Sequence, residues 1–296
     1  MVRLDSGAEH ELRLVNHCKM FITRFAPSPT GPLHLGHAYS AMLASDMAHA
    51  AGGTFLLRID DLDQSRCRPE WEAQIFADLR WLGLDWPAPV LRQSVRLPRY
   101  RVALQSLWDR GLLYPCRCSR ADIRAAATAP QEGAPLHGPD GIVYPGTCRP
   151  ARPPAGKMPM DVALRLDMQH ALRSIHNPLI YIDKGIEITV HDLAETVGDV
   201  VLARRDMGAS YHLSVVLDDA DQHITHVIRG EDLREATQIH VLLQHLFGLP
   251  MPAYHHHRLI RDDTGKRLAK RDDARAIATY RAEGASPRDI RAMVGL

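Results

Sequence analysis

Long apolar runs are missing from this chain of 296 residues, and none approaches the roughly 20 apolar residues that a membrane-spanning helix needs. Residues 1–19 are mixed and charged, without the apolar segment of an export signal. They are expected to form a disordered leader, unless Met20 is the natural start. These absences exclude a membrane protein and a secreted one, and predict a cytoplasmic location.

Disulfide pairing and a strong net charge are also absent. The net charge is +1, which neither indicates nor excludes nucleic acid, so any basic face must be local. Five cysteines, an odd number without an export signal, favour a reducing compartment and a metal site over a disulfide framework. Cys18 and Cys67 are interpreted as incidental thiols.

The stretch around residues 21–53 carries the strongest local pattern. An apolar run from Phe21 to Ala26 predicts a buried strand, and a proline-rich loop follows it. A helix is expected to open at His34 and to stop at the glycine pair 52–53. Free N–H groups and the helix dipole at such a turn favour phosphate. His34 and His37 add donors, and Gly36 leaves room for a flat base against the backbone.

A resemblance rests on two motifs in this stretch. The run Arg-Phe-Ala-Pro-Ser-Pro-Thr-Gly at 24–31, followed by His-Leu-Gly-His at 34–37, resembles the signature of class I glutamyl-tRNA synthetases. The resemblance implies a Rossmann-type, doubly wound parallel sheet. It also implies that His34 and His37 are catalytic and that His34, Gly36 and His37 bind ATP.

The order of elements agrees with an α/β fold. Residues 54–59 predict a second strand, so strand, helix and strand form a parallel crossover whose ligand site lies at the strand tips. Helices are expected around 71–82 and 100–111. Three later apolar runs are interpreted as strands of the same sheet, at residues 198–203, 211–216 and 224–228. The histidines at 255–257 are interpreted as a turn.

Composition divides the chain further. Residues 108–197 are rich in cysteine, alanine, glycine and proline, which predicts a loop-rich insertion. The resemblance implies an insertion like the acceptor-binding subdomain of the family. The expected parts are a leader, the first half of the catalytic domain, the insertion, the second half, and an ATP loop with a short helical stub: 1–19, 20–107, 108–197, 198–260 and 261–296.

Glutamate requires cations for its carboxylates and an anion for its ammonium group. Arg24 can offer a planar fork to a carboxylate, Arg229 a second one, and Tyr211 a hydroxyl. Glutamine would set its amide donors against guanidinium donors and leave polar groups unpaired. The resemblance implies that the glutamate site contains Arg24, Phe25, Ala26, Pro27, Ser28, Asp60, Tyr211 and Arg229.

Asp60 departs from the family pattern, which has a glutamate in an Arg-Ile-Glu-Asp run where this chain has Arg58-Ile59-Asp60-Asp61. The missing methylene shortens the reach toward the substrate ammonium by about 1.5 Å. Either the pocket closes up, a water bridges the gap, or the substrate is held more weakly.

A second nucleotide-binding element is expected downstream. The glycine-started basic run at 265–271 resembles the Lys-Met-Ser-Lys-Ser loop of the family, with Arg267 at the first lysine and Lys270 at the second. The resemblance implies that Arg267 and Lys270 bind ATP and that Lys270 is catalytic. Cations there would stabilise the charge that builds on departing pyrophosphate, and Mg²⁺ is expected with the ATP phosphates.

The cysteines of the insertion indicate a zinc site. Cys116 and Cys118 form a Cys-x-Cys turn, and Cys148 follows later in Tyr-Pro-Gly-Thr-Cys. The family's relatives have Cys-x-Cys followed by Tyr-x-x-x-Cys, which makes Tyr144 a fourth ligand. His137 lies in the gap between the two pieces and competes with Tyr144. A zinc ion here would shape the insertion and take no part in catalysis.

The end of the chain bears on the substrate. After Lys270 only a short helical stub is expected, with no anticodon-binding domain. Within the resemblance, this favours a subfamily that activates L-glutamate with ATP and transfers it to the queuosine base in the anticodon loop of tRNA(Asp). The protein is expected to be a monomer.

Two rival functions remain open at this stage. One is glutamylation of tRNA(Glu), and the other is a small-molecule adenylyltransferase that uses the same strand, turn and helix. The second rival has no need of Arg24, Tyr211 and Arg229, or of an insertion with three cysteines. Pyrophosphate exchange that depends on glutamate separates it from the synthetase.

Overall fold

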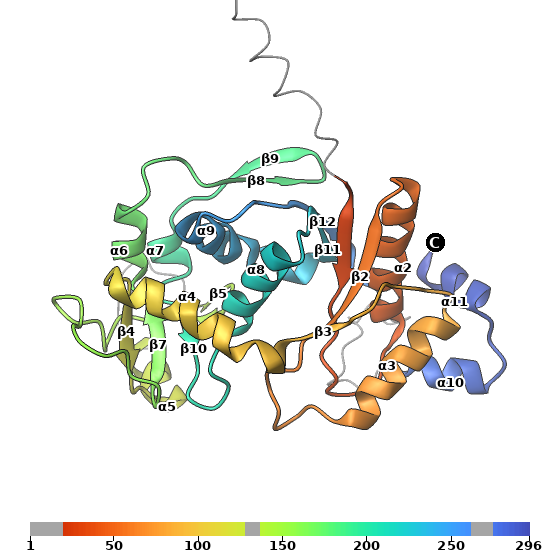
Figure 1. Ribbon diagram of the computed structural model, residues 1–296, viewed down its shortest axis with the longest axis horizontal. Helices are drawn as coiled ribbons and strands as arrows, with labels where there is room; N and C mark the ends of the chain where they lie inside the picture. Colours follow the sequence, from red (N-terminus) through yellow and green to blue (C-terminus); the bar gives the residue numbers. More distant parts are fainter. Residues whose placement is uncertain (1–19, 128–136, 262–274) are drawn as a thin grey trace, which may run out of the picture.

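The computed structural model describes residues 20–127, 137–261 and 275–296. Its strands β1 and β2 stand at the centre, with helices on both sides (Figure 1). Among the described residues, no helix combines the length and the apolar character needed to cross a bilayer.

The first crossover confirms the expected strand, turn and helix. Strand β1 (Ile22–Phe25) lies parallel to β2 (Thr54–Ile59), and helix α2 (Leu35–Ala50) connects them. A short strand, β3 (Leu91–Arg92), continues the sheet in parallel beside the end of β2. The expected α/β architecture with a parallel sheet is therefore present.

Glycine is required where α2 returns to the sheet. A Cβ on Gly53 would lie 2.0 Å from the carbonyl oxygen of Phe21, because the chain passes directly beside β1 at this point. The next residue, Thr54, donates its N–H to the same carbonyl at 2.7 Å. Gly53 thus allows β2 to start in register with β1.

A second group of strands extends this arrangement. β11 (His226–Gly230) lies parallel to β12 (Ala253–His257), and β12 pairs in parallel with the hairpin strand β8 (Ile180–Asp183). β8 and β9 (Ile186–Thr189) are antiparallel. The N–H of Thr225, just before β11, donates to the carbonyl of Ile22 at 2.9 Å, which places β11 beside β1.

The two faces of β2 pack against different cores, as alternation along a strand requires. Phe55, Leu57 and Ile59 join a buried cluster with α2, while Leu56 packs against the other cluster. In Figure 1, α2, α3, α10 and α11 lie on one side of the central strands, and α8 and α9 lie on the other. The bounds of the helices outside the first crossover, up to α11, are α3 (Pro69–Trp81), η1 (Gln93–Arg96), α4 (Leu97–Asp109), α5 (Arg120–Ala127), α6 (Met168–Arg173), α7 (Leu193–Thr196), α8 (Tyr211–Asp221), η2 (Glu231–Leu233), α9 (Thr237–Phe247), α10 (Ile277–Ala282) and α11 (Pro287–Val294).

A separate antiparallel sheet lies on the side of α4, α5 and α6 (Figure 1). It has the order β10 (Val201–Ala203), β7 (Ala163–Leu166) and β4 (Leu113–Cys116). Two very short strands, β5 (His137–Gly138) and β6 (Gly141–Ile142), form a hairpin of their own. This part of the chain carries the cysteines at 116, 118 and 148.

Three expectations from the sequence were wrong. Residues 211–216 are the start of helix α8, because Ser210 caps the helix by accepting the N–H of Leu213. The run at 198–203 contains β10, which pairs antiparallel with β7 and not with the parallel strands. Residues 255–257 belong to strand β12 and do not form a turn. The helices expected around 71–82 and 100–111 and the strand ending at Arg229 were confirmed.

Candidate active site and cysteine cluster

The two histidines of the signature form the first turn of α2. His34 is the N-cap: its Nδ1 accepts the N–H of Gly36 at 3.1 Å, and His37 Nδ1 accepts the N–H of His34 at 3.1 Å. This reciprocal arrangement is a capping box built from imidazoles. Because both Nδ1 atoms accept hydrogen bonds, each neutral ring carries its proton on Nε2 and can donate it to a phosphate oxygen.

Gly36 is required by the histidine ring. A Cβ at this position would lie 3.0 Å from Cε1 and 3.2 Å from Nδ1 of His34, closer than a side chain tolerates without displacing the imidazole. The rings of His34 and His37 lie 3.8 Å apart between centroids. The glycine therefore serves first to let His34 fold over the start of the helix.

The loop after β1 brings the tips of β1 and β2 together. Asp60 donates its N–H to the carbonyl of Pro27 at 3.0 Å, and a turn follows in which Thr30 donates to the carbonyl of Ser28 at 2.8 Å. Phe25 and Pro27 are buried, whereas Ala26 and Ser28 are half-buried. These residues thus line the edge of the sheet where β1 ends.

Four charged side chains form a buried cluster beneath this edge, called here the ion-pair cluster: Arg24, Arg58, Asp60 and Asp219. Asp219 accepts two hydrogen bonds from Arg24, from Nε at 2.9 Å and Nη2 at 3.1 Å, and a third from Arg58 Nη1 at 2.5 Å. Arg58 Nε donates to Asp60 at 2.8 Å. Two cations and two anions balance, as a buried cluster requires.

The side-on pairing with Asp219 determines which N–H groups of Arg24 can bind a substrate. It uses Nε and one hydrogen of Nη2, so the end of the guanidinium that carries Nη1 is the part that can meet a substrate carboxylate. Arg24 is 5% exposed, so such a contact would be largely shielded from water. The cluster therefore fixes the direction in which Arg24 is available.

The two carboxylates of the cluster differ in their protonation. Burial raises the pKa of Asp60 to about 6, although Arg58 acts in the opposite direction. Burial alone would also raise the pKa of Asp219, but Arg24 and Arg58 outweigh it and hold that pKa below its usual range. Asp219 is the permanent anion, and Asp60 is the one that titrates near neutral pH.

Arg229 is held more tightly than its position at a strand end suggested. It is 5% exposed and is the second-last residue of β11, and its guanidinium lies among side chains of α9 and β12. Its Nε donates to His256 at 3.2 Å, Nη1 to His240 at 3.1 Å, and Nη2 to the Thr237 hydroxyl at 2.7 Å. A further Nη2 bond reaches the carbonyl of Leu233 at 3.2 Å.

Tyr211 lies close enough to Arg229 and to the ion-pair cluster for their charges to act on its hydroxyl. Burial raises the pKa of its hydroxyl, while the nearby charges of Arg229 and Arg24 act in the opposite direction. The residue is nevertheless 39% exposed, because its ring also lines a cavity of about 160 Å³. The structure thus brings Arg24, Asp60, Tyr211 and Arg229 into one neighbourhood.

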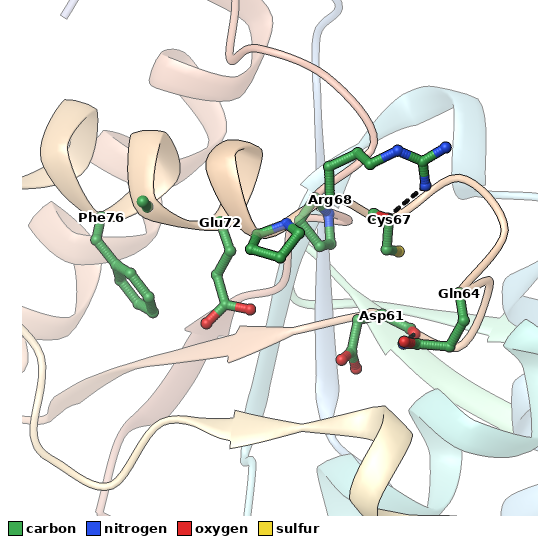
Figure 2. A pocket seen from close by; sticks show the side chains of 9 residues that line it. Asp61, Gln64, Cys67, Arg68, Glu72 and Phe76 are labelled. Carbon is green, nitrogen blue, oxygen red and sulfur yellow. Dashed lines mark hydrogen bonds between the residues drawn. The ribbon is translucent and has the colours of Figure 1, made fainter.

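The aspartate after Asp60 faces elsewhere. Asp61 accepts the N–H and the hydroxyl of Ser94, at 2.8 and 2.6 Å. Figure 2 shows its carboxylate and that of Glu72 pointing to the same side of a separate cavity, of about 310 Å³, while the Arg68 guanidinium extends away from them. Glu72 pairs with Arg92 at 2.5 Å, and Arg68 donates to the carbonyls of Ser65 and Cys67.

The predicted metal ligands of the insertion meet in the fold. The Sγ atoms of Cys116, Cys118 and Cys148 all lie within 4.8 Å of one another. The hydroxyl of Tyr144 lies 3.5 Å from the sulfur of Cys116 and 3.3 Å from that of Cys118, and it accepts the N–H of Cys148 at 2.8 Å. Three thiols and a phenol around one point form a donor set that fits zinc.

His137 lies outside this group. It is an exposed residue of β5 that pairs with Ile142, and it is not among the donors gathered with the three cysteines. The Arg165 guanidinium lies 3.8 Å from the centre of the Tyr144 ring. Burial would raise the pKa of Cys148, but hydrogen bonds, chiefly with Tyr144, lower it to about 7. Tyr144 is therefore the better placed of the two candidates.

Sequence reasoning missed several partners of these side chains. Arg58, Asp219, His240 and His256 were not singled out, although each contacts a predicted site residue. A signal existed for Asp219. It closely follows the apolar run at 213–217, and a carboxylate that is buried beside such a run needs a cation. Arg267 and Lys270 lie outside the described residues.

Comparison with known proteins identifies relatives along nearly the whole chain. Residues 20–296 match the family described as tRNA synthetases class I (E and Q), catalytic domain. A protein from Rhodobacter capsulatus, named glutamyl-Q tRNA(Asp) synthetase, is 64% identical over 282 residues, covering 93% of this chain and 100% of that protein. A protein of the same name from Nocardia farcinica is 42% identical, covering 92% of this chain and 82% of its own length.

Solved structures share the fold. Glutamate–tRNA synthetase from Elizabethkingia anophelis superposes with a TM-score of 0.72 at 27% identity, covering 94% of this chain. A glutamate tRNA ligase from Elizabethkingia meningosepticum, in complex with its amino acid, gives 0.71 at 28% identity and 93% coverage. The chain spans 61% and 60% of these two proteins, respectively.

Proposed function

Because this chain belongs to the class I tRNA synthetases of the glutamate and glutamine type, we propose that it has the activity for which its relatives are named, that of a glutamyl-Q tRNA(Asp) synthetase. In this activity the enzyme activates L-glutamate with ATP and transfers the glutamyl group to the queuosine base of tRNA(Asp). The identity of 64% over the full length of the Rhodobacter capsulatus protein supports this choice within the family.

The observation that carries the proposal is the juxtaposition of Arg24 and Asp60 at one sheet edge, joined through Arg58 and Asp219. An amino acid with a second carboxylate needs a fixed cation and a fixed anion a short distance apart. Arg24 would bind a carboxylate through its Nη1 end, and Asp60 would bind the ammonium group. Arg229 and Tyr211 would supply additional donors from β11 and α8.

The same geometry disfavours glutamine. An amide nitrogen placed against Arg24 would bring two sets of donors together and leave them unpaired, which costs about 1–3 kcal/mol for each unsatisfied group. Because Asp219 already occupies one side of Arg24, the guanidinium cannot rotate to relieve the mismatch without breaking the buried ion pair. Selectivity would thus come from a fixed arginine.

Activation then proceeds by attack of the substrate carboxylate on the α-phosphorus of ATP. An oxygen–phosphorus bond forms, the bond to pyrophosphate breaks, and the negative charge grows on the leaving group. The Nε2–H groups of His34 and His37, at the positive end of α2, would stabilise that charge. Arg267 and Lys270 are proposed to add cations to it, and Mg²⁺ is expected with the phosphates.

We further propose that Cys116, Cys118, Cys148 and Tyr144 hold one Zn²⁺ ion. The donor set fits, since three thiols and a phenol converge without another cation among them. A bound zinc would keep the thiols as thiolates and tie the turn after β4 to the segment after β6. Cys116 ends β4, which belongs to a different sheet from β1, where Arg24 lies, and from β2, which Asp60 follows. The ion would therefore have a structural role.

The decisive experiment is transfer of labelled glutamate to purified tRNA. We expect labelling of tRNA(Asp) that contains queuosine, and none of tRNA(Asp) that lacks it or of tRNA(Glu). Labelling of tRNA(Glu) instead would establish ordinary glutamyl-tRNA synthesis. Pyrophosphate exchange with ATP should require glutamate and no RNA. Exchange supported by a non-amino-acid substrate in place of glutamate would contradict the proposal.

A further inference from the structure

A line of aromatic nitrogen atoms runs from Arg229 toward the surface. Arg229 Nη1 lies 3.1 Å from Nδ1 of His240. Nε2 of His240 lies 3.1 Å from Nδ1 of His212, and Nε2 of His212 lies 3.1 Å from Oδ1 of Asp140. These four residues come from four different parts of the fold: β11, α9, α8 and the turn between β5 and β6.

Every hydrogen bond in this line has a fixed direction. A guanidinium only donates, so Nδ1 of His240 must accept and its proton must be on Nε2. That proton is donated to His212 Nδ1, which places the His212 proton on Nε2, facing Asp140. The carboxylate, which only accepts when ionised, ends the line. Arg229, His240, His212 and Asp140 therefore form one directional relay.

The relay is buried except at its outer end. His240 is 2% exposed and His212 5%, whereas the side chain of Asp140 is 38% exposed. Burial, followed by the charge of Arg229, lowers the pKa of His240 well below its ordinary value, which keeps the ring neutral and able to accept. Asp140 and His212 also line the cavity of about 160 Å³ beside Tyr211.

The remaining donors of Arg229 are also engaged. Nε donates to His256, whose Nδ1 lies 3.1 Å from Asp183, and Nη2 donates to Thr237 and Leu233. Four of the five N–H groups thus have acceptors among the described residues, which leaves one hydrogen of Nη1. Because the guanidinium is planar, the four bonds together set the direction of that hydrogen, and the bond to His240 is the one made from the same nitrogen.

We propose that His240, His212 and Asp140 are positioning residues, which aim the last N–H of Arg229 at the substrate carboxylate and link the β5–β6 hairpin to the amino-acid site. This rests on the proposed function, in which Arg229 contacts glutamate. Loss of the relay should weaken glutamate binding and leave ATP binding unchanged. Loss of the relay should not unfold the protein, because Arg229 retains its hydrogen bonds to Thr237, Leu233 and His256.

The first test compares two substitutions of His240. Glutamine can accept from Arg229 through its carbonyl and donate to His212 through its amide, whereas leucine can do neither. We expect His240→Leu to raise the KM for glutamate about tenfold in pyrophosphate exchange. His240→Gln should raise the KM for glutamate much less than His240→Leu does. The KM for ATP should be unchanged in both variants. His245→Gln, an exposed histidine on the same helix, is the matched control.

The outer end of the relay tests the link to the hairpin, at a position where folding is not at risk. Asp140→Ala should raise the KM for glutamate about threefold, and Asp140→Asn, which still accepts a hydrogen bond, should raise it less. In the Asp140→Ala background, His212→Leu should raise the KM for glutamate by a smaller factor than it does alone, since both substitutions break the same relay. The proposal would be overturned if the KM increases of Asp140→Ala and His212→Leu multiplied in the double variant. It would also be overturned if the KM for glutamate were unchanged in His240→Leu and Asp140→Ala.

A spectroscopic readout separates this proposal from the proposed function. Nitrogen NMR of labelled histidine should show Nε2 protonated and Nδ1 unprotonated for both His212 and His240. The opposite tautomer at either ring would refute the relay whatever the enzyme does. Failure of the unsubstituted protein to exchange pyrophosphate with glutamate would instead refute the proposed function.

Discussion

Two polar clusters of this protein, one buried and one partly buried, differ in how their polar groups are compensated. The ion-pair cluster under β1 and β2 contains two cations and two anions that neutralise one another. The cysteine cluster beside β4 contains three thiols and a phenol, with hydrogen-bond contacts of 3.3–3.5 Å among them and no opposite charge within the group. In the first, each charge has an opposite charge among the described residues, although Arg58 Nη2 is buried without a hydrogen-bond acceptor. The second is a set of donors that suits a cation.

The difference teaches what each cluster depends on. Buried charges persist when each has a partner, so the ion-pair cluster should form on folding alone and be ready for a substrate. Thiols that converge without a cation gain little from one another, so the cysteine cluster should depend on the proposed Zn²⁺ ion. One cluster should therefore be sensitive to substitution and the other to chelation.

The largest effect is expected for Asp219→Ala. This change leaves Arg24 and Arg58 with a single anion between them, and breaking a buried pair typically costs about 3–5 kcal/mol. Denaturant unfolding should show a loss of that size, and glutamate-dependent pyrophosphate exchange should fall below detection because Arg24 is no longer held in place. The difference in unfolding free energy between this variant and the unsubstituted protein should be the same with and without a chelator.

The same helix supplies a matched control. Asp221 lies two residues further along α8 and pairs with Arg96 and with Arg99, the latter at 3.0 Å, with 31% of its side chain exposed. A partly exposed pair contributes about 0–1 kcal/mol, so Asp221→Ala should leave both stability and exchange nearly intact. An equal loss in the two variants would mean that Asp219 has no special part in the cluster.

The second prediction concerns the metal. Cys148→Ser should reduce bound zinc from one equivalent to almost none, measured by elemental analysis. If zinc is present at 100–1,000 times its dissociation constant, losing it lowers the free energy of unfolding by about 3–4 kcal/mol. The unsubstituted protein treated with a chelator should unfold like the variant, while Cys67→Ser, outside the cluster, should keep its zinc.

Exchange activity sharpens the contrast between the clusters. Pyrophosphate exchange with glutamate should survive in Cys148→Ser at a temperature where the protein is folded, since the cysteine cluster lies beside β4, in another sheet from β1 and β2. If zinc removal stopped exchange as completely as Asp219→Ala, the metal would have a catalytic part and the division between the two clusters would fail.

The sequence predicted one cluster better than the other, for a physical reason. Cys116, Cys118 and Cys148 were recognisable because ligand spacing is local and metal chemistry allows few residue types. Arg24 was found from its motif, but its partner Asp219 is 195 positions away, and no local pattern encodes such a pair. Arg58 was named in the run that contains Asp60, but its bond to Asp219, 161 positions away, was not foreseen.

Tyr211 illustrates a different limit. Its residue type suggested a hydroxyl near the substrate, and the structure places it beside Arg229 and Arg24. Its predicted strand was wrong, because a helix that is buried on most sides also reads as a run of apolar residues. The decisive signal was Ser210, whose side chain caps the helix. A short apolar run alone does not separate helix from strand.

The third prediction uses the titration of Asp60. Its pKa is raised to about 6 from an ordinary 3.8, so below about pH 6 the folded enzyme carries a neutral carboxyl there. A neutral carboxyl cannot pair with the substrate ammonium, and kcat/KM for glutamate should therefore fall as the pH drops through 6. Asp60→Asn should be poorly active and should lack this acid limb.

Stability should follow the opposite course over the same range. Between about pH 4 and 6 the folded chain keeps the Asp60 proton that the unfolded chain has released, so the contribution of Asp60 to stability decreases as the pH rises. Asp219, whose pKa is lowered, stabilises the fold above about pH 4 and loses that contribution in acid. A difference in unfolding free energy between Asp60→Asn and the unsubstituted protein that does not vary from pH 4 to 6 would contradict this assignment.

The smallest effect on stability is expected at His34, which belongs to neither cluster. Its Nδ1 caps α2, and losing an N-cap costs about 1 kcal/mol, so His34→Ala should lower the free energy of unfolding by that amount. His34→Asn should keep the cap, because asparagine is among the best N-cap residues, but it places no Nε2–H over the phosphate. The asparagine variant should therefore be as stable as the unsubstituted protein and yet slow in pyrophosphate exchange. Full exchange in that variant would show that His34 serves only to start the helix, and the chemistry would then rest on His37 and on the charges around Arg24.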